Sequence, residues 1–228
     1  MKQTLDPQAT GHPVSIRAGI ARPEWTAPKP QVAVLTLDTS LSMDGDKAKD
    51  AIAAASGLIT ALAGPENRGC FYAGIIGFAT QAKVVAPLTA ATALADHIPG
   101  LEPSGSTNVT AALAEARKMI VTGKAMLGEN PGSSRPVVVL LSDGVHNVGV
   151  PPQAEATALK AEADVVTVAF GPDADEALLT QIATSPDHFY RCKDGAELRK
   201  FFAAVGTTLS QSIARGRNAG AALASIPR

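Results

Sequence analysis

Residues 32–42 read VAVLTLDTSLS, an apolar run that ends abruptly in a carboxylate and hydroxyls. The first six of them form a nearly continuous apolar segment, which is typical of a strand buried on both faces of a parallel sheet. A second run of this kind, VVVLL, occupies residues 137–141. Two such strands indicate the α/β class, with the sheet at the centre of the domain.

Helical and extended patterns alternate along the rest of the chain. Apolar residues recur at three- and four-residue steps in 48–62, and Asp46 is placed to cap the start of that helix. Only a few polar residues separate the apolar segments 71–79 and 83–88, which predicts a hairpin. We therefore expect an α/β fold with a doubly wound, mostly parallel open sheet, one antiparallel edge strand and helices on both faces. Further helices are predicted near 91–97, 109–120, 152–163, 174–183 and 196–213, and further strands at 165–170 and 188–190.

The chain divides into three predicted parts. Residues 1–30 hold five of the sixteen prolines and form an irregular arm with room for one edge strand. Residues 31–212 form the α/β domain. Residues 213–228 form a basic C-terminal tail or linker, because from Arg215 onward they hold three arginines and no acid. A solvated or frayed end is the favoured interpretation of this tail.

Composition excludes several classes of protein. Twenty basic and twenty-one acidic residues give a net charge of -1, so no overall field attracts nucleic acid or an anionic membrane. The first residues lack the apolar core of a signal peptide, and no apolar run approaches the roughly 18 residues of a membrane helix. Cys70 and Cys192 lie in apolar surroundings, which favours buried thiols over a disulfide. We expect a cytoplasmic protein.

Polar side chains gather where the two central strands end, and ligands of such sheets bind outside the carboxyl ends of the strands. Asp38, Ser40 and Ser42 follow the first strand, and a spacing of two in an extended loop sends them to one side. Asp143 follows the second strand. Thr107 lies in a Gly/Ser-rich loop that opens a helix, so three loops bring hydroxyls and carboxylates to this edge.

These five residues offer two carboxylates and three hydroxyls, and no sulfur or imidazole. An oxygen-only set suits a hard divalent cation, Mg²⁺ first, with Mn²⁺ and Ca²⁺ as alternatives, and argues against zinc or copper. Asp and Ser after a strand also cap the following helix, and that interpretation would be favoured for Ser42 or Thr107 alone. Five coincident positions favour the metal site.

The motifs DTSLS at 38–42, STN at 106–108 and SDG at 142–144, in this order, resemble the metal-ion-dependent adhesion site of the von Willebrand factor A (VWA) domain. The resemblance covers residues 31–212 and implies a Rossmann-like VWA fold. It implies that Ser40, Ser42 and Thr107 hold Mg²⁺ directly, while Asp38 and Asp143 act largely through water. It also implies an open coordination position for an Asp or Glu carboxylate of a protein partner.

The flanking loops supply candidates for a partner-binding rim, namely Met43, Ser104, His146 and Asn147, which would give selectivity. The resemblance implies a non-enzymatic protein-interaction module. The chain is similar to compact intracellular bacterial VWA proteins encoded beside MoxR-type AAA+ ATPases or in tellurite-resistance and stress-response clusters. There the domain is an adaptor or scaffold, so an AAA+ ATPase or a stress-response protein is the expected partner.

Two other classes stay open. Surface adhesion is disfavoured by the missing signal peptide, unless the chain is excised from a longer protein. A phosphatase of the haloacid dehalogenase type would use Asp38 as its nucleophile, but it needs a second Asp two residues further on, where this chain has Ser40. A serine hydrolase is disfavoured because no Gly-x-Ser-x-Gly elbow occurs.

Overall fold

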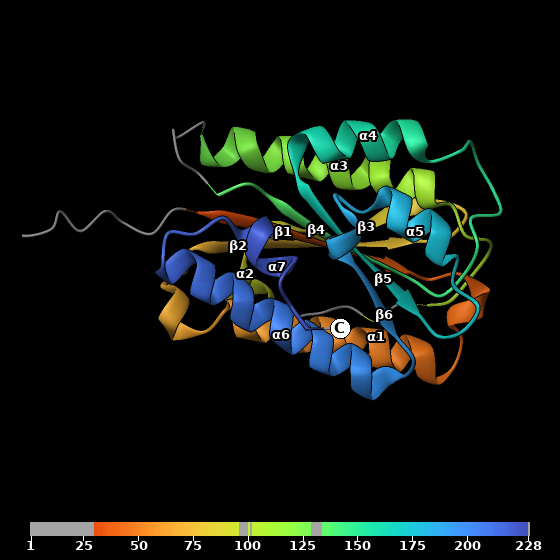
Figure 1. The fold of residues 1–228 in the computed structure, drawn as a ribbon, viewed down its shortest axis with the longest axis horizontal. Coiled ribbons are helices and arrows are strands. Elements are labelled where there is room, and N and C mark those ends of the chain that lie inside the picture. The colour runs from red at the N-terminus through yellow and green to blue at the C-terminus, as the bar shows by residue number, and fades with distance from the viewer. Residues whose placement is uncertain (1–29, 96–99, 101, 129–133, 228) are drawn as a thin grey trace, which may run out of the picture.

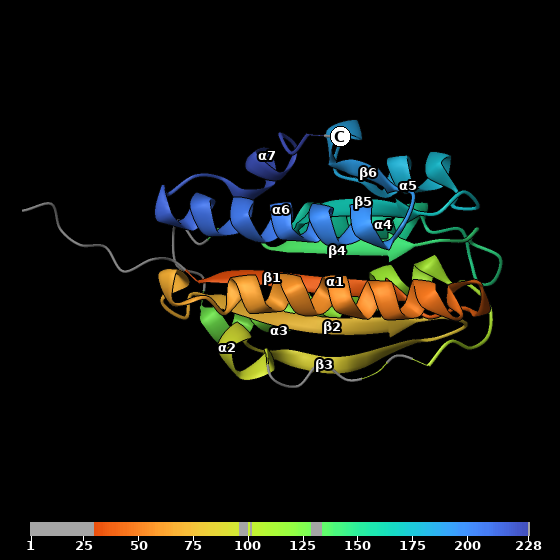
Figure 2. The ribbon, with the colours of Figure 1, turned by 90° about the horizontal axis from the view of Figure 1, so that it is seen from below.

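The fold is described by a computed structural model for residues 30–95, 100, 102–128 and 134–227. Its strands are β1 (Gln31–Asp38), β2 (Phe71–Phe78), β3 (Ala82–Ala90), β4 (Val137–Ser142), β5 (Asp164–Phe170) and β6 (Phe189–Cys192). They form one sheet in the order β3-β2-β1-β4-β5-β6 (Figure 2). All neighbours run parallel except β2 and β3, which are antiparallel. The predicted sheet, with its antiparallel edge strand, is confirmed.

Helices cover both faces of the sheet. They are α1 (Asp46–Leu62), α2 (Ala91–Leu94), α3 (Val109–Leu127), α4 (Gln153–Glu162), α5 (Glu176–Ile182), α6 (Gly195–Ala214) and α7 (Ala219–Leu223). One face carries α3, α4 and α5, and the other carries α1, α2, α6 and α7 (Figures 1 and 2). None of the helices in the described ranges is both long enough and apolar enough to cross a membrane.

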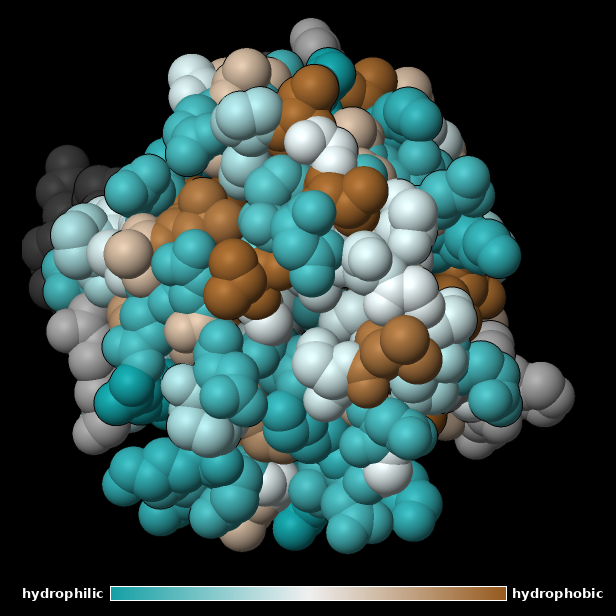
Figure 3. Space-filling model, turned by 90° about the vertical axis from the view of Figure 1, so that its right-hand side faces the viewer, coloured by the Kyte–Doolittle hydropathy of each residue, from teal (hydrophilic) through white to brown (hydrophobic). Residues whose placement is uncertain are grey.

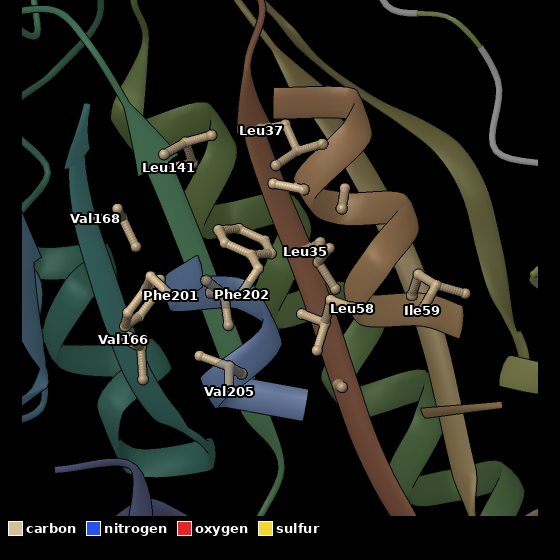
Figure 4. Packing of buried hydrophobic residues seen from close by; sticks show 14 of the residues in the cluster. Leu35, Leu37, Leu58, Ile59, Leu141, Val166, Val168, Phe201, Phe202 and Val205 are labelled. Carbon is tan, nitrogen blue, oxygen red and sulfur yellow. The ribbon is translucent and has the colours of Figure 1, made fainter. Parts of the chain in front are cut away.

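The central strand β1 is buried on both faces, as its apolar run predicts. Val34 packs with the helices of one face, including Leu113 of α3. Leu35 and Leu37 point to the opposite face, where they pack with Leu58 of α1 and Phe202 of α6 (Figure 4). Because alternate side chains anchor β1 from both sides, its carboxyl end is held in a fixed place.

Two local predictions are wrong. Asp46 does not cap α1: it is the first helical residue, and Gly45 stands at the cap with φ of 72°, a conformation that favours glycine. The C-terminal segment is not a solvated tail, because α7 packs against the sheet. Ala219 and Leu223 are buried there, and the Tyr190 hydroxyl donates a hydrogen bond to the Leu223 carbonyl.

Two predicted segments lie wholly or partly outside the described residues. The predicted N-terminal arm, residues 1–30, lies outside the described residues except for Pro30, as does the end of the helix predicted over 91–97.

The two cysteines are buried thiols, as predicted. Burial, together with the nearby Glu197 and Asp194 carboxylates, raises the pKa of the Cys192 thiol to about 12, so this side chain stays protonated at neutral pH.

Candidate metal centre

Three loops meet at the edge of the sheet where the parallel strands end. The strands β1, β2 and β4 run in the same direction, so their carboxyl ends lie together (Figure 2). The loop after β1 spans residues 39–45, the loop before α3 contains residues 102–108, and the loop after β4 spans residues 143–152. Every residue of the predicted metal site lies on one of these loops or at the end of β1.

The first loop folds back on the end of β1. Asp38 is the last residue of the strand and is only 1% exposed, and the Ser40 backbone N–H donates to its Oδ1 atom over 2.8 Å. The Ser40 and Ser42 hydroxyl oxygens are 2.9 Å apart. The predicted place of Met43 on the rim is wrong. Its side chain is 1% exposed and packs in the core, because a short 3₁₀ turn over Leu41–Met43 directs it inward.

The third loop joins the first through carboxylate hydrogen bonds. Asp143 is fully buried; its Oδ1 accepts from the Ser42 hydroxyl over 2.7 Å, and its Oδ2 lies 2.5 Å from the Lys47 Nζ. The Ser142 hydroxyl donates to Asp38 Oδ2 over 2.6 Å. Both carboxylates are therefore held in one network with the hydroxyls of Ser40 and Ser42.

Two loop residues hold Thr107 in place. The Thr107 N–H donates to Asn147 Oδ1 over 2.9 Å, and the Asn147 N–H donates to the Thr107 carbonyl over 3.1 Å. Beside this pair, His146 Nδ1 accepts from the Val109 N–H over 3.2 Å. Asn147 and His146, predicted as rim residues, thus bind the loop before α3 and the first residue of α3, respectively, through their side chains. Asn147 is exposed and His146 is partly exposed.

The first two loops are joined by backbone hydrogen bonds. The Ser104 N–H donates to the Thr39 carbonyl over 2.8 Å, and the Leu41 N–H donates to the Gly105 carbonyl over 3.2 Å. Ser104 is exposed beside the first loop, where the rim prediction places it. Each loop is therefore bound to the other two, which preorganises the hydroxyls and carboxylates.

Gly144 leaves a space between two hydroxyls. A Cβ atom at residue 144 would lie 3.3 Å from Ser42 Oγ and 3.3 Å from Thr107 Oγ1. The hydroxyls of the first and second loops therefore converge on one point, and a side chain there would crowd both of them. This convergence brings Thr107 into the group formed by Asp38, Ser40, Ser42 and Asp143.

Negative charge is in excess within this group. Burial raises the pKa of the Asp38 carboxyl above its ordinary value of 3.8, and the charge of Asp143 acts in the same direction, while hydrogen bonds from Ser142 and Ser40 oppose them. Among the described residues, Lys47 forms an ion pair with Asp143, and no ion pair is formed by Asp38. An added cation would relieve this excess, since buried carboxylates of like charge repel each other.

The donor set fits a divalent cation. All five side chains present oxygen atoms, the ligands that hard cations prefer. Within the described ranges, no three His, Cys, Asp and Glu side chains come together as a metal-binding group, so a metal here would depend on the hydroxyls. The structure brings the five predicted residues together, and their assignment as metal ligands stays a prediction.

Sequence reasoning missed two residues of this site. Ser142 positions the Asp38 carboxylate, and Lys47 pairs with Asp143. A signal for Lys47 exists in the sequence: a cation in the first turn of a helix faces the positive end of the helix dipole and needs an acidic partner nearby. No pattern in the sequence marks Ser142 as a positioning residue.

The fold and these loops define a doubly wound α/β domain with an oxygen-rich ligand site at the carboxyl edge of its sheet. The chain belongs to the von Willebrand factor type A domain family, whose model matches residues 33–204. Domains of this family are protein-interaction modules. No curated protein sequence matches the chain significantly.

Several solved structures share the fold. Proximal thread matrix protein 1 from the mussel byssus is 25% identical with a TM-score of 0.64, and the match covers 78% of this chain and 46% of that protein. Another structure of the same mussel protein is described as having a zinc-occupied MIDAS motif. It is 23% identical with a TM-score of 0.64, and the match covers 82% of this chain and 48% of that protein. MIDAS denotes the metal-ion-dependent adhesion site.

Two bacterial structures are also similar. A von Willebrand factor type A protein from Catenulispora acidiphila is 20% identical with a TM-score of 0.67, and the match covers 81% of this chain and 43% of that one. The pilus adhesin SpaC from Lactobacillus rhamnosus GG is 17% identical with a TM-score of 0.65, and the match covers 84% of this chain and 31% of SpaC. This chain thus spans less than half the length of the mussel, Catenulispora and Lactobacillus proteins.

Proposed function

We propose that this domain binds a divalent cation, Mg²⁺ in preference to others, and uses it to bind a carboxylate of a protein partner. The observation that carries the proposal is that three mutually bound loops bring five oxygen-bearing side chains to one edge of the sheet, with the Ser42 and Thr107 hydroxyls next to Gly144. Ser40, Ser42 and Thr107 would hold the cation, with the carboxylates of Asp38 and Asp143 next to it. When bound, the cation supplies a strong positive charge for an anionic oxygen.

A carboxylate is the proposed ligand because the direct donors are neutral hydroxyls. Hydroxyl oxygens leave most of the cation's charge uncompensated, so an incoming Asp or Glu carboxylate gains a charge-assisted contact. Mussel thread matrix protein 1 is described with zinc at this motif, which supports a divalent cation here. Mg²⁺ is preferred on the donor chemistry, since zinc in proteins favours Cys and His ligands.

The surroundings of the site favour a protein partner. Leu41 is 65% exposed, Val145 is 52% exposed and Val150 is 67% exposed, and all three lie on the loops that carry the site. Hydrophobic groups are scattered among hydrophilic ones on this side of the molecule (Figure 3). A polar centre with apolar side chains around it offers a partner both a directional contact and buried apolar surface.

The side chains that an enzyme would use for catalysis are buried and hydrogen-bonded, which supports a binding role. Both carboxylate oxygens of Asp38 accept hydrogen bonds and the residue is 1% exposed, which leaves no accessible nucleophile for a phosphatase. His188 is buried, and its two ring nitrogens contact the Ser185 hydroxyl and the Gly220 carbonyl. We therefore propose a non-enzymatic role.

We further propose that the domain is an adaptor or scaffold in an intracellular bacterial complex, with an AAA+ ATPase or a stress-response protein as its partner. The similarity to compact bacterial VWA proteins supports this role. Two buried thiols, Cys70 and Cys192, are compatible with a reducing cytoplasm.

Affinity capture tests the proposal. The immobilised domain is exposed to a bacterial extract in Mg²⁺ and in EDTA, and the Thr107→Ala variant is tested beside the wild type. A specific partner should be retained by the wild type in Mg²⁺, and lost both in EDTA and by Thr107→Ala. The hydrogen bonds that the Thr107 backbone makes with Asn147 do not involve the Thr107 side chain, so the variant should keep the fold.

Thr207→Ala is the matched control, since this exposed threonine lies in α6 and its hydroxyl bonds only within that helix. It should behave as the wild type. A partner that binds equally well in EDTA and to Thr107→Ala would refute a metal-bridged contact.

A further inference from the structure

Lys47 is a cation built into the candidate metal centre. It is the second residue of α1, and its Nζ lies 2.5 Å from Asp143 Oδ2. The Asp143 side chain is fully buried, whereas 31% of the Lys47 side chain is exposed. The ammonium therefore reaches the carboxylate from the solvent side of the site.

The position of Lys47 in the helix is unfavourable without that carboxylate. The first turn of a helix carries the positive end of the helix dipole, which disfavours a cation. The Lys47 ammonium also lies close to the loop after β5, since a Cβ at Gly171 would be 3.7 Å from its Nζ. The contact with Asp143 compensates for this placement.

Lys47 is also the counter-charge of the site. The Lys47 ammonium forms the ion pair with Asp143. Among the described residues, no basic side chain forms an ion pair with Asp38. Removing one partner of a pair that has a buried member leaves an uncompensated charge, which destabilises a fold strongly. Lys47 therefore stabilises the domain in the absence of a metal.

We propose that Lys47 is an internal competitor of the divalent cation: its ammonium neutralises Asp143 in the metal-free domain and opposes the metal when it binds. This inference rests on the metal site proposed above. A divalent cation and an ammonium that draw on the same buried carboxylate repel each other, because both are positively charged and lie close to that carboxylate. Lys47 thus weakens metal binding while keeping the metal-free domain folded.

The experiment compares Lys47→Met with the wild type and with Lys49→Met. Lys49 lies on the same helix and forms a pair with Asp46 whose side chains are 79% and 94% exposed, so the control removes the same charge without touching Asp143. Mg²⁺ affinity is measured by calorimetry at fixed salt. The melting temperature is measured in EDTA and in saturating Mg²⁺.

Lys47→Met should bind Mg²⁺ about tenfold more tightly than the wild type, which corresponds to about 1.4 kcal/mol. It should melt at a lower temperature in EDTA, and Mg²⁺ should raise its melting temperature more than that of the wild type. Lys49→Met should resemble the wild type in both measurements. Lys47→Gln, which can still donate a hydrogen bond to Asp143, replaces Lys47→Met in the comparison if the latter does not fold in EDTA.

Unchanged or weaker Mg²⁺ binding by the Lys47 variant used in the comparison, beside a wild type that binds Mg²⁺, would overturn the competition and leave the metal site intact. Binding by Lys47→Met alone would support the competition in its strongest form. If neither protein binds Mg²⁺ or another divalent cation, the proposed metal site itself is wrong and the competition with it.

Discussion

Gly144→Ala is a perturbation that should impair the metal site and leave the fold intact. Gly144 does not have a positive φ, so alanine can adopt its backbone conformation. The added Cβ would lie 3.3 Å from the hydroxyl oxygens of Ser42 and Thr107, which is closer than ordinary contact. Both oxygens would have to move back by a few tenths of an ångström.

The expected loss follows from the geometry that Mg²⁺ demands. This cation accepts only near-ideal octahedral coordination, with oxygens at about 2.0–2.1 Å. Displacing two of three hydroxyl donors should cost about 1–2 kcal/mol of binding free energy, which weakens affinity roughly 5- to 30-fold. The free energy of unfolding in EDTA should change by less than about 1 kcal/mol, because no large core contact is lost.

Calorimetric Mg²⁺ titration and urea unfolding in EDTA measure the two quantities separately. Gly57→Ala is the control, since Gly57 is exposed within α1 and an added Cβ would meet nothing within 4 Å. It should leave Mg²⁺ affinity unchanged and stabilise the helix by about 0.5–1 kcal/mol. Wild-type Mg²⁺ affinity in Gly144→Ala would refute the convergence of Ser42 and Thr107 on the cation.

Two further variants test the electrostatics of the site and the packing of the C-terminus. Because burial raises the folded-state pKa of Asp38 above 3.8, its contribution to stability is complete below about pH 3.8 and is lost as the pH rises through the folded-state value. Asp38→Asn should therefore be more stable than the wild type at neutral pH in EDTA, and urea unfolding across acid pH should show the difference shrinking. Leu223→Ala should lower the free energy of unfolding by about 2–5 kcal/mol, because Leu223 is fully buried. A loss below about 0.5 kcal/mol in urea unfolding would mean that α7 is not part of the stable domain.

The sequence predicts most of the sheet because burial leaves a strong pattern. Strands β1 and β4 are buried on both faces, and a short apolar run is typical of such a strand. Helix α7 was missed because its arginine-rich surroundings suggested a solvated tail. Ala219, Leu223 and Ile226, at steps of four and three, are buried and were the signal of an amphipathic segment.

The candidate site is predictable in its members and less so in its details. Spacing after the strands identifies the hydroxyls and carboxylates, since parallel strands end at one edge. The prediction for Met43 assumes an extended loop, whereas the 3₁₀ turn over Leu41–Met43 turns the Met43 side chain into the core. Lys47 and Ser142 contact residues far away in sequence, so the sequence does not show which residue each of them binds.

A crystal of the domain soaked in Mn²⁺ would show whether the metal binds at these loops, because anomalous scattering locates the ion without reference to any assumed ligand. We predict one strong peak among the oxygens of Ser40, Ser42 and Thr107, with the carboxylates of Asp38 and Asp143 beside it. A peak elsewhere on the molecule, or none at saturating Mn²⁺, would contradict the assignment of this loop cluster as a metal centre.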